Sequence, residues 1–247
     1  MIVRGVNHLE FQYETDDDLL HLMFAKKYLD EYYASCKLFV WYMPYSRMDR
    51  KIEGDLFTLK YICDFINWLN FKRVIVMEPH SDKTLIMLNK NAVAVYPIKD
   101  WLPRVQLGIG FGENDRIVLP DKGAVNRYAD ENIKDICIIE KRRNPITCSI
   151  EDMYLKEGSV PAGSKCIIVD DLCSRGGTAL RAAKILKERG AGEVFLAVSH
   201  LEEAAFKGEI LSDYSPINAI FATKSMTSKE HPKVNYIDID LNEYWNS

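Results

Sequence analysis

The sequence predicts an α/β protein with two halves, each a mostly parallel sheet flanked by helices. Short apolar runs alternate along the chain with longer segments whose apolar residues recur every three or four positions. Several of the short runs are apolar at every position, as expected for strands that are covered on both faces. Alternation of this kind is typical of parallel sheets with crossover helices.

The first half of the chain contains one set of alternating strands and helices. We expect one or two strands within residues 1–14, followed by a helix that Thr15 caps and that has three aspartates in its first turn. The other expected elements are a strand at 37–42, a helix at 55–69, and strands at 73–77 and 92–98. A boundary near Trp101 to Pro103 would divide the chain into two domains, residues 1–100 and 101–247.

The second half shows the same alternation without a repeat of the sequence itself. The expected elements are a strand at 116–119, a helix ending near 130, a strand at 136–139, a polar stretch to 164, a strand at 166–169, a helix from 179 capped by Gly190, and strands at 194–198, 218–222 and 234–239. The two halves are therefore expected to share one architecture.

Composition argues against nucleic acid and membranes as partners. The net charge of −4 gives no general attraction for nucleic acid. No apolar run approaches the length of a membrane span, and the N-terminus has no basic region followed by an apolar one. The six cysteines are scattered, without a C-x-x-C pair or the spacing of metal ligands. We expect a soluble cytoplasmic protein with reduced thiols.

Residues 165–178, KCIIVDDLCSRGGT, are the most informative stretch for function. Asp170 and Asp171 follow an apolar strand, at the edge where an open α/β sheet binds ligands. Gly176 and Gly177 then allow close backbone approach just before a helix N-terminus, which favours an anion. An acidic pair beside an anion site suits ribose hydroxyls, a divalent cation, or both. A solvated acidic turn is the alternative, and a Walker loop is excluded because no Gly-Lys-Ser/Thr follows.

Other expected strand ends also finish in polar clusters. Lys141, Arg142 and Arg143 follow a buried strand directly and precede the long polar stretch. A charge run is usually a solvated turn. The position after a buried strand favours instead a cationic loop that closes over phosphates and stabilises the charge of phosphoryl transfer. Because the carboxyl ends of parallel strands share one edge, several such turns can meet at one ligand.

These segments resemble motifs of the ribose-phosphate diphosphokinases, enzymes with a phosphoribosyltransferase-type fold that make phosphoribosyl diphosphate. VDDLCSRGGT resembles their ribose-phosphate loop, and KRRNP resembles their catalytic loop, whose signature ends in Lys-Arg-Arg-Pro. Residues 120–125 resemble their Pro-Asp-x-Gly-Gly/Ala segment, 78–80 their Asp-Leu-His turn, and 42–51 their Tyr-Ala-Arg-Gln-Asp-Arg-Lys nucleotide segment. The five matches follow the family's order over nearly the whole chain, which implies two phosphoribosyltransferase-like halves.

The resemblance implies transfer of the β,γ-diphosphate of Mg-ATP to the anomeric hydroxyl of ribose 5-phosphate, with release of AMP. It also implies Mg²⁺ as cofactor, ATP as co-substrate, small-molecule substrates only, and a homo-oligomer. The implied site residues are Lys141 and Arg143 for catalysis; Asp170, Asp171, Ser174, Arg175, Gly176, Gly177 and Thr178 for ribose phosphate; Arg47, Met48, Asp49 and Arg50 for ATP; and His80 and Asp121 for the metal.

Departures from the family pattern keep other functions open. The family's amino-terminal Phe-x-Asp-Gly-Glu segment, which reaches the ATP of a neighbouring subunit, has no counterpart, Asn144 is inserted in the catalytic loop, and Met48 replaces a glutamine. Arg175 stands in a loop where the family has Asp-Thr-Ala-Gly-Thr, and its several donors would suit a larger acceptor such as ADP-ribose. A phosphoribosyltransferase and a non-catalytic regulatory relative are the remaining alternatives.

Overall fold

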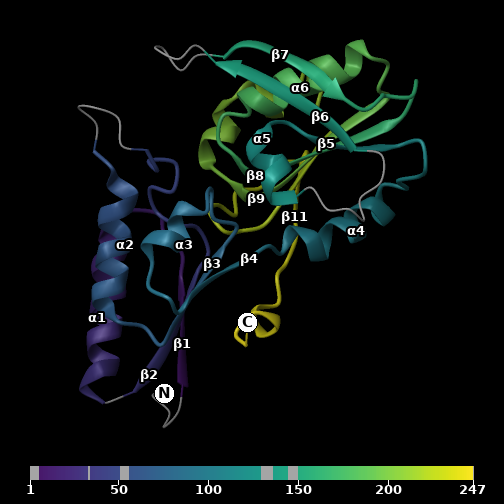
Figure 1. Cartoon of the computed structure of the whole chain (residues 1–247). Coiled ribbons are helices and arrows are strands. Elements are labelled where there is room, and N and C mark those ends of the chain that lie inside the picture. The colour runs from purple at the N-terminus through teal and green to yellow at the C-terminus, as the bar shows by residue number, and fades with distance from the viewer. Residues whose placement is uncertain (1–5, 33, 51–55, 129–135, 144–149, 247) are drawn as a thin grey trace. The chain divides into compact units, whose positions relative to one another are not determined.

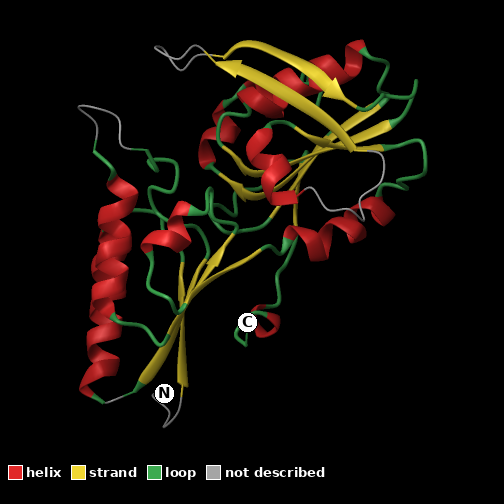
Figure 2. Cartoon of the chain, viewed as in Figure 1, coloured by secondary structure: helices red, strands yellow, loops and turns green. Residues whose placement is uncertain are grey.

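The computed structural model describes residues 6–32, 34–50, 56–128, 136–143 and 150–246 (Figure 1). Contacts divide the chain into two compact units. The first unit comprises Met1–Pro97 together with Ile239–Ser247, and the second comprises Ile98–Asp238. Each unit is an α/β structure on a mostly parallel sheet, as the sequence predicts (Figure 2).

The first unit has a four-stranded parallel sheet in the order β1-β2-β3-β4. Its elements are β1 (Val6–Phe11), α1 (Asp17–Glu31), β2 (Ser35–Val40), α2 (Thr58–Leu69), β3 (Arg73–Met77), α3 (Lys83–Met87) and β4 (Ala92–Val95). One apolar core packs α1 and α2 against the first three strands. A second cluster packs Phe39, Ile75 and Met77 of the sheet against Tyr244 and Trp245. The last residues of the chain therefore complete the core of the first unit.

Local hydrogen bonds set the ends of the first two helices. Asn70, in the left-handed conformation with φ of 55°, ends α2. Asp16, and not Thr15, occupies the position before α1, and its side chain makes no capping bond. The backbone N–H groups of Glu14 and Thr15 donate instead to Oδ2 of Asp18, at 2.9 and 2.8 Å. The prediction that Thr15 caps α1 is therefore wrong; the carboxylate of Asp18 instead holds the backbone that leads into the helix.

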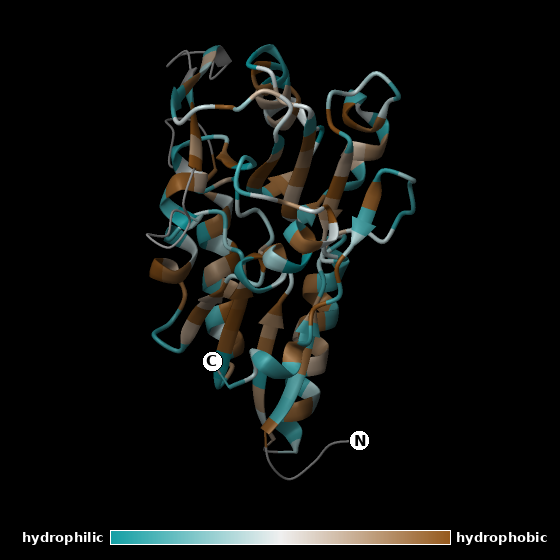
Figure 3. Ribbon diagram, turned by 90° about the vertical axis from the view of Figure 1, so that its right-hand side faces the viewer, coloured by the Kyte–Doolittle hydropathy of each residue, from teal (hydrophilic) through white to brown (hydrophobic). Residues whose placement is uncertain are grey.

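The second unit has a seven-stranded sheet in the order β11-β10-β9-β8-β5-β6-β7. Its elements are α4 (Ile98–Gly108), β5 (Arg116–Leu119), α5 (Lys122–Tyr128), β6 (Ile136–Arg143), β7 (Ile150–Glu157), β8 (Lys165–Cys173), α6 (Gly177–Glu188), β9 (Glu193–Leu201), β10 (Ala219–Ala222) and β11 (Val234–Tyr236). Its neighbouring strands are parallel except for the pair β6 and β7. Many of the strand residues are hydrophobic (brown in Figure 3) and buried.

Two helices lie where the sequence predicted none. The short helix α3 follows β3, and α4 occupies the region of the expected strand end and domain boundary. In α4 the buried residues Ile98, Trp101, Leu102 and Val105 recur at helical spacing. Pro103 lies inside this helix. The sequence reasoning missed this helix, in which burial of the apolar face outweighs the helix-breaking tendency of one proline.

The cationic run lies on a strand instead of an exposed turn. β6 continues through Lys141 to Arg143 and pairs with β7, so the two strands form an antiparallel ladder where a polar loop was expected. On β7, Met153 and Leu155 alternate with exposed residues and pack against the core of the second unit. The turn prediction was wrong because this alternation, which is typical of a half-buried strand, was not recognised.

The sequence analysis expects reduced thiols and no membrane-spanning segment. The cysteines in the described residues, at positions 36, 63, 137, 166 and 173, are buried and form no disulfide. Burial raises the pKa of the Cys63 and Cys173 thiols to about 12. Cys148 lies outside the described residues. None of the described helices combines the length and apolar composition that crossing a bilayer requires.

Candidate functional site

Four elements of the second unit bring charged and polar side chains together. Asp170 and Asp171 lie near the end of β8, and Thr178 lies in the first turn of α6. Asp121 lies between β5 and α5, and Lys141 lies on β6. Because β5, β6 and β8 run parallel and β5 lies between the other two, their carboxyl ends meet at one edge of the sheet.

The acidic pair lies within β8 itself. The sequence suggests that the strand ends at Val169, but β8 continues to Cys173, which pairs with Leu201 of β9. Asp171 is buried, and its backbone N–H donates to Oδ1 of Asp170 at 3.0 Å. Two carboxylates that are held by a strand have fixed positions, which favours a binding role over a solvated acidic turn.

Arg127, which the sequence reasoning missed, binds both carboxylates. Its Nη2 lies 3.1 Å from Oδ1 of Asp170 and 2.8 Å from Oδ1 of Asp171. No sequence pattern marks this arginine; in the structure, Gly123 lies four residues earlier on the same face of α5. A Cβ at Gly123 would lie 3.1 Å from Oδ1 of Asp121 and 3.5 Å from Nη1 of Arg127. Glycine therefore allows α5 to lie close to these charged groups.

Lys141 connects Asp121 with the start of α6. Its Nζ donates to Oδ2 of Asp121 at 2.7 Å and to Oγ1 of Thr178 at 3.2 Å. It lies two residues after Ile139, a core residue that packs with α6, so the strand's alternation points both side chains to that face. Oδ1 of Asp121 accepts the N–H of Ala124 at 2.9 Å and so holds the first turn of α5.

We use the term charged cluster for Asp121, Arg127, Lys141, Asp170 and Asp171. Burial opposes ionisation of Asp121, but the ammonium of Lys141 outweighs it and lowers the pKa of that carboxyl below its usual value. Burial and the neighbouring Asp171 instead raise the pKa of Asp170 well above its usual value, and Arg127 only partly offsets them. Two carboxyl groups of one cluster therefore have pKa values shifted in opposite directions, as is common in functional sites.

The turn between β8 and α6 contains one glycine that the fold requires and one that it does not. Gly176 has a φ of 78°, and a Cβ there would lie 2.5 Å from Cδ1 of Ile210. A Cβ at Gly177 would meet no atom within 4 Å. No side chain caps the N-terminus of α6, so its first N–H groups can bind an anion. Ser174 is half-buried and Arg175 is exposed.

The predicted ATP residues of the first unit show a different arrangement. Arg47, Met48 and Arg50 are exposed, whereas Asp49 is buried. The backbone carbonyl oxygen of Asp49 accepts a hydrogen bond from Nζ of Lys83, at 2.6 Å. The acidic residue of this segment is therefore buried, whereas its three neighbours in the predicted ATP set are exposed. Whether these residues bind ATP stays a prediction.

His80 and Arg143 also remain predictions. His80 is half-buried and follows β3 by three residues. Glu78, in the same turn, is buried and has a φ of 43°, a conformation that non-glycine residues adopt mainly where the surroundings enforce it. His80 and Asp121 belong to different units, and their binding of one metal ion stays a prediction. The side chain of Arg143 lies outside the described residues.

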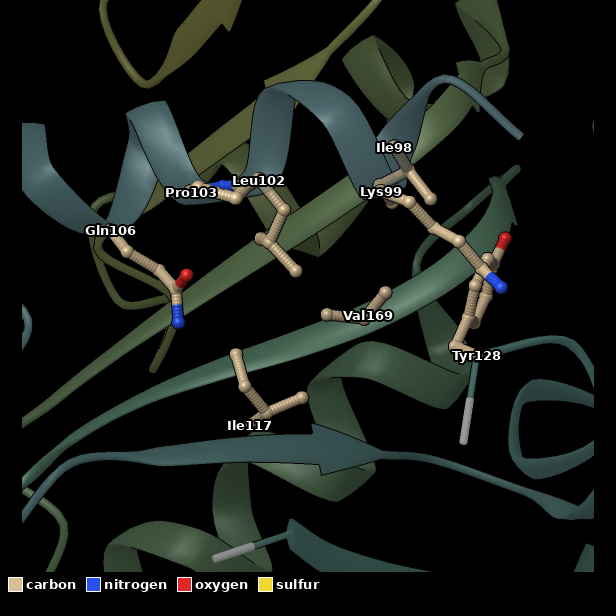
Figure 4. A pocket seen from close by; sticks show the side chains of 8 residues that line it. All are labelled: Ile98, Lys99, Leu102, Pro103, Gln106, Ile117, Tyr128 and Val169. Atoms are coloured by element: carbon tan, nitrogen blue, oxygen red, sulfur yellow. The ribbon is translucent and has the colours of Figure 1, made fainter. Parts of the chain in front are cut away.

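A cavity of about 170 Å³ lies between α4 and the sheet of the second unit (Figure 4). Its lining residues are Ile98, Lys99, Leu102, Pro103, Gln106, Ile117, Tyr128 and Val169. Tyr128 follows Arg127 in the chain, and Val169 precedes Asp170. The walls are mostly apolar, so this cavity is a poor match for phosphate groups.

Carboxylate oxygens are the atoms of the charged cluster that could hold a metal ion. Within the described residues, no group of three or more His, Cys, Asp or Glu side chains could form a metal site. Mg²⁺ commonly binds through one or two carboxylates and takes its other ligands from water and substrate phosphates. Asp121, whose side chain is 29% exposed, fits this mode better than Asp170 and Asp171, whose side chains are 14% and 5% exposed.

A comparison with protein families matches residues 124–223 to the phosphoribosyl transferase domain. Among curated proteins, the chain is 28% identical to the ribose-phosphate pyrophosphokinase of Pyrococcus furiosus over 76% of this chain and 67% of that protein. It is 34% identical to that of Marinomonas sp., over 64% of this chain and 51% of the relative. The chain spans about half to two thirds of the length of these curated relatives.

The fold is similar to that of a solved relative. The phosphoribosylpyrophosphate synthetase from Mycobacterium smegmatis matches with a TM-score of 0.76 and 20% identity, over 96% of this chain and 80% of that protein. At this identity the match concerns the fold alone. It agrees with the expectation of two phosphoribosyltransferase-like halves.

Proposed function

We propose that the chain is a ribose-phosphate pyrophosphokinase (diphosphokinase), like the curated relatives to which it is similar. In the proposed reaction, the anomeric hydroxyl of ribose 5-phosphate attacks the β-phosphorus of ATP. The bond between the β-phosphorus and the oxygen that bridges it to the α-phosphorus breaks, AMP leaves, and the hydroxyl proton passes to solvent. The products are phosphoribosyl diphosphate and AMP.

The observation that best supports this proposal is the charged cluster at the carboxyl edge of the second sheet. It places two fixed carboxylates and a buried lysine around the open N-terminus of α6. A ribose phosphate has hydroxyls to donate and a phosphate to be held, and both kinds of partner are present here. Phosphoryl transfer needs positioning and charge neutralisation more than covalent chemistry, which is what such a cluster offers.

We assign ribose binding to the β8–α6 segment. Asp170 and Asp171 accept hydrogen bonds from the ribose hydroxyls, and residues 174–178 hold the 5′-phosphate at the N-terminus of α6. Arg127 is a positioning residue in this scheme. Its contacts with both aspartates favour their ionised, accepting forms against the cost of burial.

We assign the diphosphate to Lys141, with Arg143 beside it in the sequence. Lys141 now pairs with Asp121, and it would exchange that partner for phosphate oxygens as charge develops in the transition state. Arg47, Met48, Asp49 and Arg50 are the proposed ATP contacts. Among these, the exposed side chains are free to meet a nucleotide, and the buried Asp49 would support the turn.

Mg²⁺ is the proposed cofactor, with Asp121 and His80 as its protein ligands. The carboxylate of Asp121 has the oxygen donors that this hard cation prefers and is partly open to solvent. Bound there, Mg²⁺ would neutralise charge on the triphosphate. We further propose that the enzyme acts on small molecules in the cytoplasm, as a homo-oligomer.

ADP-ribose is the second candidate acceptor, because Arg175 is exposed in the phosphate-binding turn. An arginine fork there could bind an additional phosphate. If Arg175 selects the acceptor, Arg175→Thr will change the ratio of activities on ADP-ribose and ribose 5-phosphate. An unchanged ratio would rule this role out.

One assay tests the proposed function and its alternatives. The protein is mixed with Mg²⁺, ATP and either ribose 5-phosphate or ADP-ribose, and AMP is followed by chromatography. We expect AMP to form only when an acceptor is present. Conversion of phosphoribosyl diphosphate and a nitrogenous base to a nucleotide, without AMP release from ATP, would indicate a phosphoribosyltransferase instead. Binding of ATP without turnover would indicate a regulatory relative.

A further inference from the structure

The cavity between α4 and the sheet of the second unit has two apolar walls (Figure 4). Leu102 and Pro103 form the wall on α4, and Ile117 of β5 and Val169 of β8 form the wall on the sheet. Leu102, Ile117 and Val169 are buried. The two walls face each other across the cavity, so a flat apolar molecule between them would contact protein atoms on both of its faces.

The two ends of the cavity are polar. Gln106 lies at one end, and Lys99 and Tyr128 lie at the other (Figure 4). Lys99 is exposed, Gln106 is half-buried and Tyr128 is buried, so the rim of the cavity on α4 is accessible to solvent. The lysine ammonium donates hydrogen bonds, whereas the amide and the phenol can both donate and accept them.

We propose that this cavity is an effector site for a single six-membered nitrogen heterocycle of the pyrimidine-base class. Its volume of about 170 Å³ is well below the roughly 300 Å³ at which pockets for drug-sized ligands begin. It is close to the roughly 150 Å³ of an apolar cavity that binds benzene. One ring therefore fits, and a ring with an attached sugar does not.

The polar ends favour a heterocycle over a hydrocarbon ring. A hydrocarbon would fill the space between the walls but would take polar groups at both ends out of water without giving them partners. A pyrimidine base has carbonyl and N–H groups around its edge and two apolar faces. Its edge would bond at both ends of the cavity while its faces contact the two walls, which supplies the dispersion contacts that a void lacks.

An occupied cavity would act on the charged cluster through Tyr128. The Cζ of Arg127 lies 5.5 Å from the centre of the Tyr128 ring, and the same guanidinium binds Asp170 and Asp171. Val169, on the sheet wall, directly precedes Asp170. A substrate at the acidic pair should therefore change the affinity of the cavity for its ligand, because coupling between two binding sites is reciprocal. This coupling rests on the proposed function, whereas binding in the cavity does not.

The test is a titration of the full chain with uracil, followed by ligand-detected NMR. We expect a dissociation constant of about 1 mM or lower. Benzene, which lacks the hydrogen bonds, and uridine, which carries a sugar, should each bind at least about 10-fold more weakly. Leu102→Phe fills the cavity and should weaken uracil binding at least about 10-fold. Leu107→Phe is the matched control, because Leu107 is an 84% exposed residue of the same helix, and it should leave binding unchanged.

A second variant covers the case in which circular dichroism shows that Leu102→Phe does not fold. Gln106→Leu keeps the apolar walls and removes one polar end, so uracil should bind about 3-fold to 10-fold more weakly while benzene binds no less tightly.

Four results overturn the proposed binding. These are a uracil dissociation constant above about 10 mM, benzene binding as tight as uracil binding, uracil affinity unchanged in a folded Leu102→Phe or Gln106→Leu variant, and uridine binding as tight as uracil binding. The second would make the cavity a plain apolar void, and the last would mean that the ring belongs to a larger ligand.

The effector role is tested by repeating the uracil titration with saturating ribose 5-phosphate. We expect the dissociation constant of uracil to change about 5-fold or more, the usual lower limit of allosteric coupling. An unchanged constant, in a protein that releases AMP from ATP with this acceptor, overturns the effector role. If uracil binds as expected but no AMP is released with any acceptor, the proposed function fails and the binding site stands.

Discussion

The two regions with predicted phosphate-binding cations differ in how the protein holds them. In the charged cluster of the second unit, the side chains of Lys141 and Arg127 are 6% and 11% exposed, and each is bound to carboxylates. In the 42–50 segment of the first unit, Arg47 and Arg50 are exposed. Similar sequence patterns, in which polar clusters follow buried strands, thus give one preorganised site and one open turn.

The difference comes from the elements that carry the residues. Lys141, Asp170 and Asp171 lie on strands, whose ladders fix the backbone, and Arg127 lies on a helix packed against them. The 42–50 segment lies beyond the end of β2. Groups held in place before the substrate arrives need no reorganisation in the transition state. We therefore expect changes in the cluster to lower kcat or stability, and changes in the segment to raise KM.

The largest effect is expected at Lys141. The variant Lys141→Ala removes a buried donor aimed at developing charge, so kcat should fall about 100-fold or more. Steady-state AMP release measures this directly. Lys156→Ala is the matched control, since Lys156 is an exposed cation on the adjacent strand β7 that pairs with Glu140. Near-normal turnover in Lys141→Ala would remove the main distinction between the two regions.

The next effect concerns Arg127 and has a defined dependence on pH. Arg127→Gln leaves two buried carboxylates without their cation, which should cost about 3 kcal/mol of unfolding free energy. Arg127 lowers the pKa of Asp170, which burial holds above its usual value, so its removal raises that pKa further. The ionised pair accepts the ribose hydroxyls, and activity is lost as pH falls through this pKa. The acidic limb of the pH profile should therefore move to higher pH.

Denaturant unfolding and a pH series of kcat/KM measure these two outcomes. Arg127→Lys keeps the charge and should restore part of the stability and of the wild-type acidic limb. An acidic limb that does not move in Arg127→Gln would mean that Arg127 has only a structural role.

Substitutions at the two adjacent glycines of the β8–α6 turn should affect stability and ligand binding separately. Gly176→Ala forces a Cβ into Ile210 and a residue with a side chain into a positive φ, at a cost of about 1–3 kcal/mol. Gly177→Ala meets no protein atom within 4 Å and should leave unfolding unchanged. If the turn holds the 5′-phosphate, Gly177→Ala will instead raise the KM for the acceptor. Denaturant unfolding and acceptor titrations of both variants distinguish these outcomes.

The smallest effect is expected in the 42–50 segment. Arg47→Ala removes an exposed cation, so stability should stay within about 0.5 kcal/mol of the wild type. The KM for ATP should rise roughly 10-fold, the scale of one charge-assisted hydrogen bond to a phosphate. A fall in kcat at unchanged KM would show that this segment is as preorganised as the charged cluster.

The sequence predicted most strands because their apolar runs are continuous and short. The runs at 73–77 and 166–169 are buried strands, as expected. It missed α4 because Pro103 resembles a boundary signal, although the apolar residues around it recur at helical spacing. It missed β7 because the alternation of Met153 and Leu155 lies in a stretch that is polar overall. Burial by neighbouring elements, which no local pattern reports, decided both cases.

The site was predicted in its parts but not in its contacts. Asp170, Asp171, Asp121 and Lys141 were each identified at a strand end, and the second unit brings them into one cluster. Arg127 was not identified, because a single arginine in a short helix has no distinctive pattern. Its role follows from the packing of α5 against β8, a contact between residues more than forty positions apart. That this cluster and the predicted site residues of the first unit bind the same substrates stays a prediction.

The central claim is that the β-phosphorus of ATP is the atom attacked. The direct test uses ATP labelled at the β-phosphorus, with Mg²⁺ and ribose 5-phosphate, and follows the label by chromatography. The account predicts that the label leaves the nucleotide with the ribose product and that the AMP is unlabelled. Label retained in ADP would indicate transfer of the γ-phosphate alone, and that result would contradict the account.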